Sequence, residues 1–336
     1  MKPFRARFAL GVSAILFFIV FLVSMGLGRY YIPPSTVLRV LLEPLLPFDG
    51  EWLPQAEIVL FRIRLPRVLL GVFVGAGLSC SGAVYQNIFQ NPLVSPELLG
   101  ASSGAAFGAA LAIHNGLAYH EISLCAFATG LAAVGIVVLV SSRSGGRSVL
   151  KLLLAGIMVS SLSSAGISYL KLVADPNNTL PAITYWLMGS LASTRQLDLL
   201  FAAPLILAGI VMLFFMRWRI NILSVGDEEA GAMGVDVKRV RVLAVLGATF
   251  ITAACVSVSG VIGWVGLVVP HFARFIAGAD CRWSIPASIL LGGTLLPATD
   301  VFSRMLSTSE VPIGILTAFA GAPFLLYLIV RERSGI

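Results

Sequence analysis

Long apolar segments follow one another along almost the whole chain, and the connections between them hold most of the charged residues. A helix crosses the roughly 30 Å hydrocarbon core of a bilayer with about 20 residues. We therefore expect about ten membrane-spanning helices, near residues 9–28, 68–89, 98–113, 122–141, 150–170, 198–216, 241–261, 263–277, 284–303 and 312–330. The segments lack the alternation of a membrane β-strand, so the predicted fold is an all-α polytopic membrane protein. The third and eighth segments are short, and tilted, broken or only partly inserted helices are all compatible with them.

The first apolar segment follows Lys2, Arg5 and Arg7, as the apolar part of a signal peptide does, and no charge lies between Phe8 and Arg29. It is too long for that part of a signal peptide, and it lacks a convincing small-residue cleavage site. We therefore expect it to remain as a membrane anchor within a single transmembrane domain of residues 1–336.

The amino-acid composition excludes a soluble protein. Of the 336 residues, 58% are hydrophobic and only 12% are charged, against about 25% charged in a typical soluble domain. So few charges could not cover a soluble surface without leaving large apolar patches. The four cysteines are too few for a disulfide scaffold, and no pair of them has metal-ligand spacing.

The distribution of cationic residues predicts that both termini are cytoplasmic, because cytoplasmic connections carry an excess of Lys and Arg. With ten spans, fifteen cationic residues share the side of the termini: Lys2, Arg5, Arg7, Arg143, Arg147, Lys151, Arg217, Arg219, Lys238, Arg239, Arg241, Arg274, Arg282, Arg331 and Arg333. Eight lie on the other side: Arg29, Arg39, Arg62, Arg64, Arg67, Lys171, Arg195 and Arg304. The net charge of +7 therefore reflects membrane topology, and nucleic acid is not expected as a partner.

The interior of the predicted spans carries no Asp, Glu, Lys or Arg near its middle. Ion-coupled transporters commonly place ionisable groups there, so this absence disfavours that class, although backbone carbonyls can also bind Na⁺. Catalysis within the membrane is not indicated either, because the spans carry no HExxH, GxSxG or paired carboxylates. We therefore expect a transport protein that is not an enzyme and that takes its energy from outside the bundle.

The connection between the second and third spans, residues 86–100, is uncharged apart from Glu97 and contains Asn91-Pro92, which favours a turn. A loop folded back toward a pore mouth and an ordinary connecting loop are both compatible with it. The longest cytoplasmic connection, residues 217–241, contains three carboxylates after Gly226, where they stabilise the start of a short helix. Its small Ala and Met residues suit insertion into a partner's groove; a solvated connector is the alternative.

Arg62, Arg64 and Arg67 crowd the outer start of the second span, and Arg304 follows the ninth span. This placement opposes the charge bias of the other connections. Docking of an acidic partner would explain it, and so would side chains that reach toward lipid phosphates.

Several motifs together resemble the FecCD family of ATP-binding-cassette (ABC) importer permeases. They occur in order and at family spacing from about residue 60 to residue 331, and they are Arg64-Leu65-Pro66-Arg67, Gly75-Ala76-Gly77-Leu78, Asn91-Pro92-Leu93, Pro96-Glu97-Leu98-Leu99-Gly100, Ala230-Gly231-Ala232-Met233-Gly234-Val235, Gly266-Leu267-Val268-Val269-Pro270-His271-Phe272-Ala273-Arg274 and Gly321-Ala322-Pro323-Phe324. The family carries His271 and Arg274 irrespective of cargo, which favours a structural role over metal ligation by His271.

The resemblance implies a type II ABC importer permease fold and assigns roles to three groups of residues. Arg64, Arg67 and Arg304 would dock an extracytoplasmic substrate-binding protein, and Asn91, Pro92 and Leu93 would form a cytoplasmic gate. A coupling region at about residues 220–238 would receive the motion of the ATPase through Gly226, Asp227, Glu228, Glu229, Ala230, Gly231, Ala232, Met233 and Gly234.

The resemblance also implies a homodimer, or a pair of homologous permeases, with two ATP-binding subunits in the inner (plasma) membrane. The sequence lacks GxxxxGK[ST], so ATP and Mg²⁺ would be bound by the partner ATPase, and no cofactor by this chain. The expected cargo is a metal chelate, with a ferric siderophore as the first candidate. Haem, cobalamin and oxyanion import remain alternatives within the family, and an ion-coupled secondary transporter is the alternative of a different class.

Overall fold

The computed structural model describes residues 3–42, 54–143 and 149–333, and the regular structure in these ranges is entirely helical. Lys2 and Arg147, which entered the charge count above, lie outside the described residues. The long helices are α1 (Pro3–Gly26), α4 (Leu65–Ile88), α5 (Ala101–His114), α6 (Tyr119–Arg143), α7 (Val149–Val173), α9 (Gln196–Leu223), α11 (Val237–Ser259), α12 (Val265–Ala277), α13 (Cys281–Met305) and α14 (Ile313–Arg333). The short elements are α2 (Pro34–Leu42), α3 (Pro54–Ile58), the π-helix η1 (Val59–Arg64), the 3₁₀-helix η2 (Pro96–Leu99), α8 (Thr179–Leu187) and α10 (Asp227–Ala232).

Each predicted span coincides with one long helix, which confirms the all-α fold. Among the described residues, seven helices are long and apolar enough to cross a membrane. The third and eighth spans, predicted to be short, are α5 and α12, with 14 and 13 residues. The prediction was wrong at the start of the second span: α3 and η1 lead directly into α4, so the apolar helical segment runs from Gln55 to Ile88 over 34 residues.

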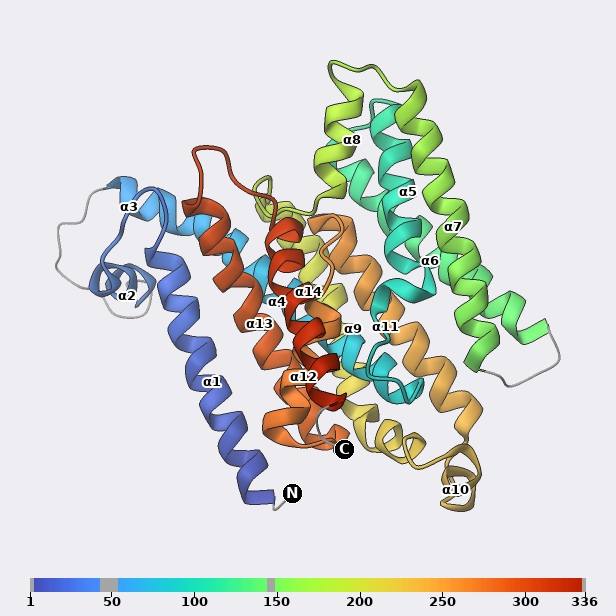
Figure 1. The fold of residues 1–336 in the computed structure, drawn as a ribbon. Helices are drawn as coiled ribbons and strands as arrows, with labels where there is room; N and C mark the ends of the chain where they lie inside the picture. The colour runs from blue at the N-terminus through green and yellow to red at the C-terminus, as the bar shows by residue number, and fades with distance from the viewer. Residues whose placement is uncertain (1–2, 43–53, 144–148, 334–336) are drawn as a thin grey trace.

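Helix α4 lies at the centre of the bundle and packs against α9, α11, α12 and α13 (Figure 1). Close approach depends on glycine at two points: a Cβ on Gly75 would overlap the carbonyl oxygen of Gly292 in α13, and one on Gly82 would overlap that of Gly266 in α12. The small residues predicted to allow tight helix packing therefore do so here.

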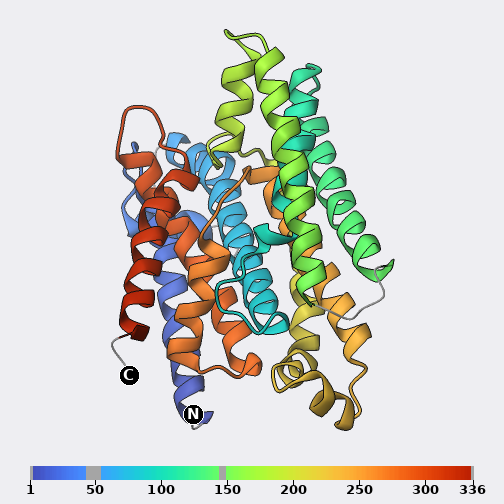
Figure 2. The ribbon, with the colours of Figure 1, turned by 45° about the vertical axis from the view of Figure 1, so that its right-hand side comes forward.

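The helices α5–α8 form a second group beside this core, and α7 lies on its outside (Figures 1 and 2). Only 11% of the most apolar stretch of α7 is buried, against 78% for α11. Both figures place the η2 segment between α7 and α14, so these three elements share one face of the molecule. Both figures also place the two chain termini and α10 at the same end of the bundle, whereas α3 and α8 lie toward the opposite end.

Candidate functional site

An ion-pair network lies at the end of the bundle opposite to the termini, which the sequence predicts to be the outer end. We call it the outer arginine cluster. It consists of Arg64, Arg67, Asp300, Arg304 and Glu310. The guanidinium of Arg67 binds two carboxylates at once: its Nη2 lies 2.8 Å from Asp300 Oδ1 and 2.7 Å from Glu310 Oε2. Its Nε and Nη1 complete the two pairs, to Asp300 at 3.0 Å and to Glu310 Oε1 at 3.0 Å. Two-point pairs of this kind fix orientation as well as charge.

The other two arginines of the cluster hold the end of α1. Arg304 pairs with Asp300 Oδ2 at 3.1 Å and donates to the carbonyl oxygens of Ser24 and Leu27. Arg64 donates to the carbonyl oxygen of Met25 at 2.6 Å and also to those of Gly26 and Tyr30. The last carbonyls of a helix lack partners within the helix and carry its negative dipole end. Arginines from α13 and from the end of η1 therefore cap α1.

The three arginines predicted to dock a binding protein are thus buried and paired within this chain. Arg64, Arg67 and Arg304 are 4%, 6% and 6% exposed, whereas the neighbouring Arg62 is exposed. Their docking role stays a prediction. Sequence reasoning missed the two carboxylates, although the spacing of Asp300 and Arg304, four residues apart on one helix, is a signal for such a pair.

The predicted gate residues form a turn after α4. The N–H of Asn91 donates to the carbonyl oxygen of Gln86 at 3.1 Å, and Asn91 Oδ1 accepts from the N–H of Leu93 at 2.9 Å. Asn91, Pro92 and Leu93 are exposed, and the chain then returns to the bundle at Pro96, which is buried. This return supports the folded-back alternative for residues 86–100, and the gating role stays a prediction.

Side-chain hydrogen bonds tie this turn to its neighbours, and sequence reasoning missed them. Gln90, whose φ is +48°, donates from Nε2 to the carbonyl oxygen of Leu223 at 3.1 Å. Leu223 is the last residue of α9 and lies within the predicted coupling region, before its short helix. Gln86 donates to the carbonyl oxygen of Leu267 and accepts from Arg274 Nη1 at 2.6 Å. The turn is therefore bonded to the end of α9 through Gln90, and the last turn of α4 before it is bonded to α12 through Gln86.

The short helix expected after Gly226 is present as α10, and an ion pair braces it. Arg241 in α11 binds Asp227 at two points, 2.6 Å from Oδ1 and 3.1 Å from Oδ2. The Arg241 side chain is 15% exposed and that of Asp227 47%. Within α10, the side chain of Ala230 is fully buried. The remaining predicted coupling residues of α10 and Met233 are exposed: Glu228, Glu229, Gly231 and Ala232.

A cavity of about 620 Å³ lies between the end of α8 and α14, on the face that α7 and η2 share. Met188, Val261, Ala318, Phe319 and Pro323 are among the residues that line it, so its walls are apolar. None of the residues predicted to dock the binding protein or to receive the ATPase lines it.

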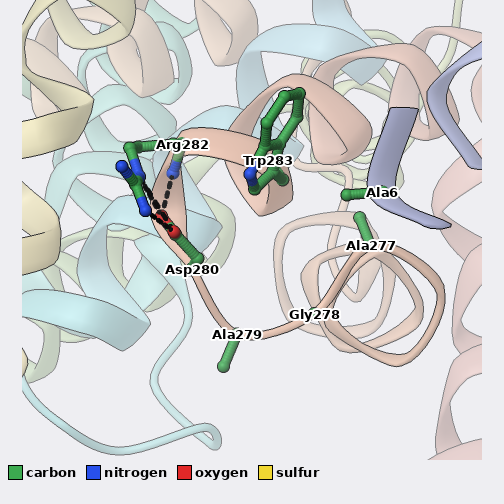
Figure 3. Close-up of a pocket in the computed structure, with 7 residues that line it drawn as sticks. All are labelled: Ala6, Ala277, Gly278, Ala279, Asp280, Arg282 and Trp283. Carbon is green, nitrogen blue, oxygen red and sulfur yellow. Dashed lines mark hydrogen bonds and ion pairs between the residues drawn. The ribbon is translucent and has the colours of Figure 1, made fainter. Parts of the chain in front are cut away.

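A second cavity, of about 390 Å³, lies between the first turns of α1 and the connection from α12 to α13 (Figure 3). Ala6 and Trp283 stand on one side, and Arg282 pairs with Asp280 on the other. Hydrogen bonds from Arg282 hold the pKa of the Asp280 carboxyl below its usual value. None of the predicted docking, gate or coupling residues lines this cavity.

The histidine and cysteine residues fit structural roles. His271 lies 3.5 Å from Arg274 Nη2 and packs edge-on against the ring of Phe324. Cys80, Cys255 and Cys281 are buried, and Cys281 is the first residue of α13, where the sequence had predicted a loop. In the part of the chain that the structure describes, no three His, Cys, Asp or Glu side chains come together as a metal site.

An all-helical bundle with seven helices long and apolar enough to cross a membrane, among the described residues, is the architecture of an integral membrane protein. The chain matches the FecCD transport family over residues 16–331 and belongs to that family. It is 38% identical to the molybdate import permease MolB of Haemophilus influenzae over 314 residues, covering 93% of this chain and 92% of the relative. It is 41% identical to an iron chelatin transport permease of Helicobacter pylori, described as probable, over 285 residues, covering 85% and 86%.

A solved metal-chelate type ABC transporter in an inward-facing conformation has the same fold. It superimposes with a TM-score of 0.86 at 37% identity and covers 96% of this chain and 98% of its own. The chain is therefore an ABC importer permease of the FecCD family, as its motifs predicted, and it is a transport subunit rather than an enzyme by itself.

Proposed function

We propose that this permease moves a metal chelate, with a ferric siderophore as the first candidate, from the outside of the inner membrane to the cytoplasm. The permease of Helicobacter pylori named for iron chelatin supports this cargo. The molybdate permease of Haemophilus influenzae supports oxyanion import as the alternative; haem and cobalamin remain further candidates. Both termini and α10 would lie in the cytoplasm, in agreement with the excess of cationic residues at that end.

The proposed translocation path lies on the face formed by α7, η2, α8 and α14. The apolar cavity between α8 and α14 would form one wall. The opposite wall would be α7, which exposes the hydroxyl residues Ser161, Ser164 and Ser168 along one side. The hydroxyls of Ser161 and Ser168 donate to carbonyl oxygens of their own helix. Because these two hydroxyls are already bonded within the helix, they fit a protein partner or a solvated path as well as lipid, and the proposal for this wall depends on the low burial of α7.

A path on an open face requires a second wall, and we propose that a second copy of this chain, or a homologous permease, supplies it. The low burial of α7 and the exposed apolar side chains of α14, such as Phe319 at 77%, support an interface there. A closed two-fold arrangement would place two such faces around one central path.

The energy would come from two partner ATPase subunits that bind ATP and Mg²⁺ and contact α10. The observation that carries the proposed function is the exposed α10, braced by Asp227 and Arg241 at the cytoplasmic end of a FecCD-family bundle. A rigid short helix can pass a displacement by the ATPase to α11.

Uptake into proteoliposomes tests the proposal. The permease is reconstituted with its partner ATPase and substrate-binding protein, and uptake of a ferric siderophore, haem, cobalamin and molybdate is compared. Saturable uptake of the ferric siderophore that requires ATP is the expected result. ATP-dependent uptake of molybdate alone would overturn the cargo, and uptake by the permease alone from an ion gradient would overturn the mechanism.

A further inference from the structure

The outer arginine cluster has one more positive than negative charge. Three guanidinium groups face two carboxylates, and the other partners of Arg64 and Arg304 are uncharged backbone carbonyls. A partly buried cationic site of this kind favours an additional carboxylate. The arginines nevertheless lie below the surface, so an incoming carboxylate must first reach one of them.

The two carboxylates of the cluster differ in accessibility. The Asp300 side chain is 2% exposed and bridges Arg67 and Arg304, so it is enclosed by the cluster. The Glu310 side chain is 26% exposed and binds Arg67 alone. Glu310 is therefore the more accessible carboxylate on Arg67, and its departure leaves the contact between Arg67 and Asp300 in place.

Glu310 also lies three residues before the start of α14. It follows an exposed connection, residues 306–309. One residue later the chain is fixed again, because Val311 exchanges hydrogen bonds with Ser303: its N–H donates to the Ser303 carbonyl at 3.2 Å and its carbonyl accepts from Ser303 Oγ at 2.6 Å. α14 begins at Ile313. The ion pair between Glu310 and Arg67 is thus made close to α14, the helix that lines the proposed path.

We infer that Glu310 is an exchangeable carboxylate, whose place on Arg67 is taken by a carboxylate of the substrate-binding protein when that protein docks. This inference rests on the proposed function. The exchange keeps the number of ion pairs on Arg67 constant, so docking does not require an unpaired buried guanidinium. The connection before α14 loses one anchor in this exchange, while Arg29 still binds the carbonyl oxygens of Ser307 and Thr308 and Val311 still bonds to Ser303.

Binding measurements on the permease–ATPase complex in nanodiscs test the exchange. For Glu310→Gln we expect the dissociation constant for the binding protein to fall about tenfold, because Arg67 is freed from its competitor. For Glu310→Asp, whose shorter side chain holds Arg67 less well at unchanged net charge, we expect a fall of about threefold. The matched control is Glu57→Gln, which removes an exposed carboxylate from the same end of the protein without touching the cluster, and it should stay within about twofold.

Unchanged or weaker binding by Glu310→Gln, in protein that melts within a few degrees of wild type, would overturn the exchange. An equal effect of Glu57→Gln would also overturn it, since a general change in surface charge would then explain the result. If wild-type permease binds no extracytoplasmic protein at all, the proposed function fails instead. The two failures are therefore distinguishable.

Discussion

The two ends of the bundle use the same chemistry, an arginine bound at two points to a carboxylate, in opposite surroundings. At the outer end, the Arg67 and Asp300 side chains are 8% and 2% exposed and join a network that reaches α1, α4, α13 and the start of α14. At the other end, Arg241 and Asp227 form a single pair, 15% and 47% exposed, between α10 and α11. A buried charge becomes costly when its partner is removed, whereas a half-exposed pair contributes little to stability. The comparison indicates that the outer network fixes the fold, while the inner pair fixes the orientation of one short helix.

The largest expected effect follows from removing the carboxylate at the centre of the outer network. Asp300→Asn leaves Arg67 and Arg304 buried with one carboxylate fewer, which should cost about 3–5 kcal/mol of unfolding free energy. Thermal unfolding in detergent, followed by the accessibility of buried cysteines to a thiol dye, measures the loss. Glu310→Gln is the control, since the more exposed carboxylate should cost clearly less. An equal or smaller loss for Asp300→Asn would mean that the network does not hold the fold.

A smaller effect, visible in function rather than stability, is expected at the inner pair. Arg241→Gln frees α10 from α11, so the amount of cargo moved per ATP hydrolysed should fall about fivefold. Stability should change by only about 1 kcal/mol, because Asp227 is 47% exposed and stays hydrated when its partner is removed. The exchanged pair Asp227→Arg with Arg241→Asp should restore much of the coupling. Uptake and ATPase rates measured in the same proteoliposomes give the ratio.

The matched control for this prediction is Arg239→Gln. Arg239 lies on the same turn of α11, pairs with Asp236, and is 84% exposed, so the change removes the same charge without touching α10. If both variants lower the ratio equally, surface charge and not the brace is responsible. If neither does, α10 does not need the ion pair to transmit motion.

The spans and the short α10 could be predicted from the sequence, because apolar length and a glycine before three carboxylates are local signals. The surroundings of the outer arginines could not. Arg64, Arg67 and Arg304 are predicted at a docking surface because they oppose the charge bias of the loops. Arg67 is buried against Asp300, 233 residues away, and Arg64 and Arg304 bind carbonyl oxygens at the end of α1, which no local pattern indicates. Only the pair of Asp300 and Arg304, four residues apart on one helix, has a local signal. The extension of α4 through η1 was missed for a related reason. Its apolar face packs on α1 and α2, and that packing stabilises a helix which the three arginines interrupt in the sequence.

The smallest expected effect tests whether the inner end is also joined to the gate turn. Gln90 bonds the carbonyl of Leu223 from a left-handed backbone conformation, which Asn also tolerates. Gln90→Asn should therefore keep the turn but lose the bond, since its side chain is one methylene shorter. We expect about a twofold fall in cargo moved per ATP, in line with one hydrogen bond of about 0.5–1.5 kcal/mol. Gln90→Gly relaxes the backbone and loses the same bond, so it should behave like Gln90→Asn. A loss confined to Gln90→Gly would show that the conformation of the turn, and not its bond to α9, connects the gate to α10.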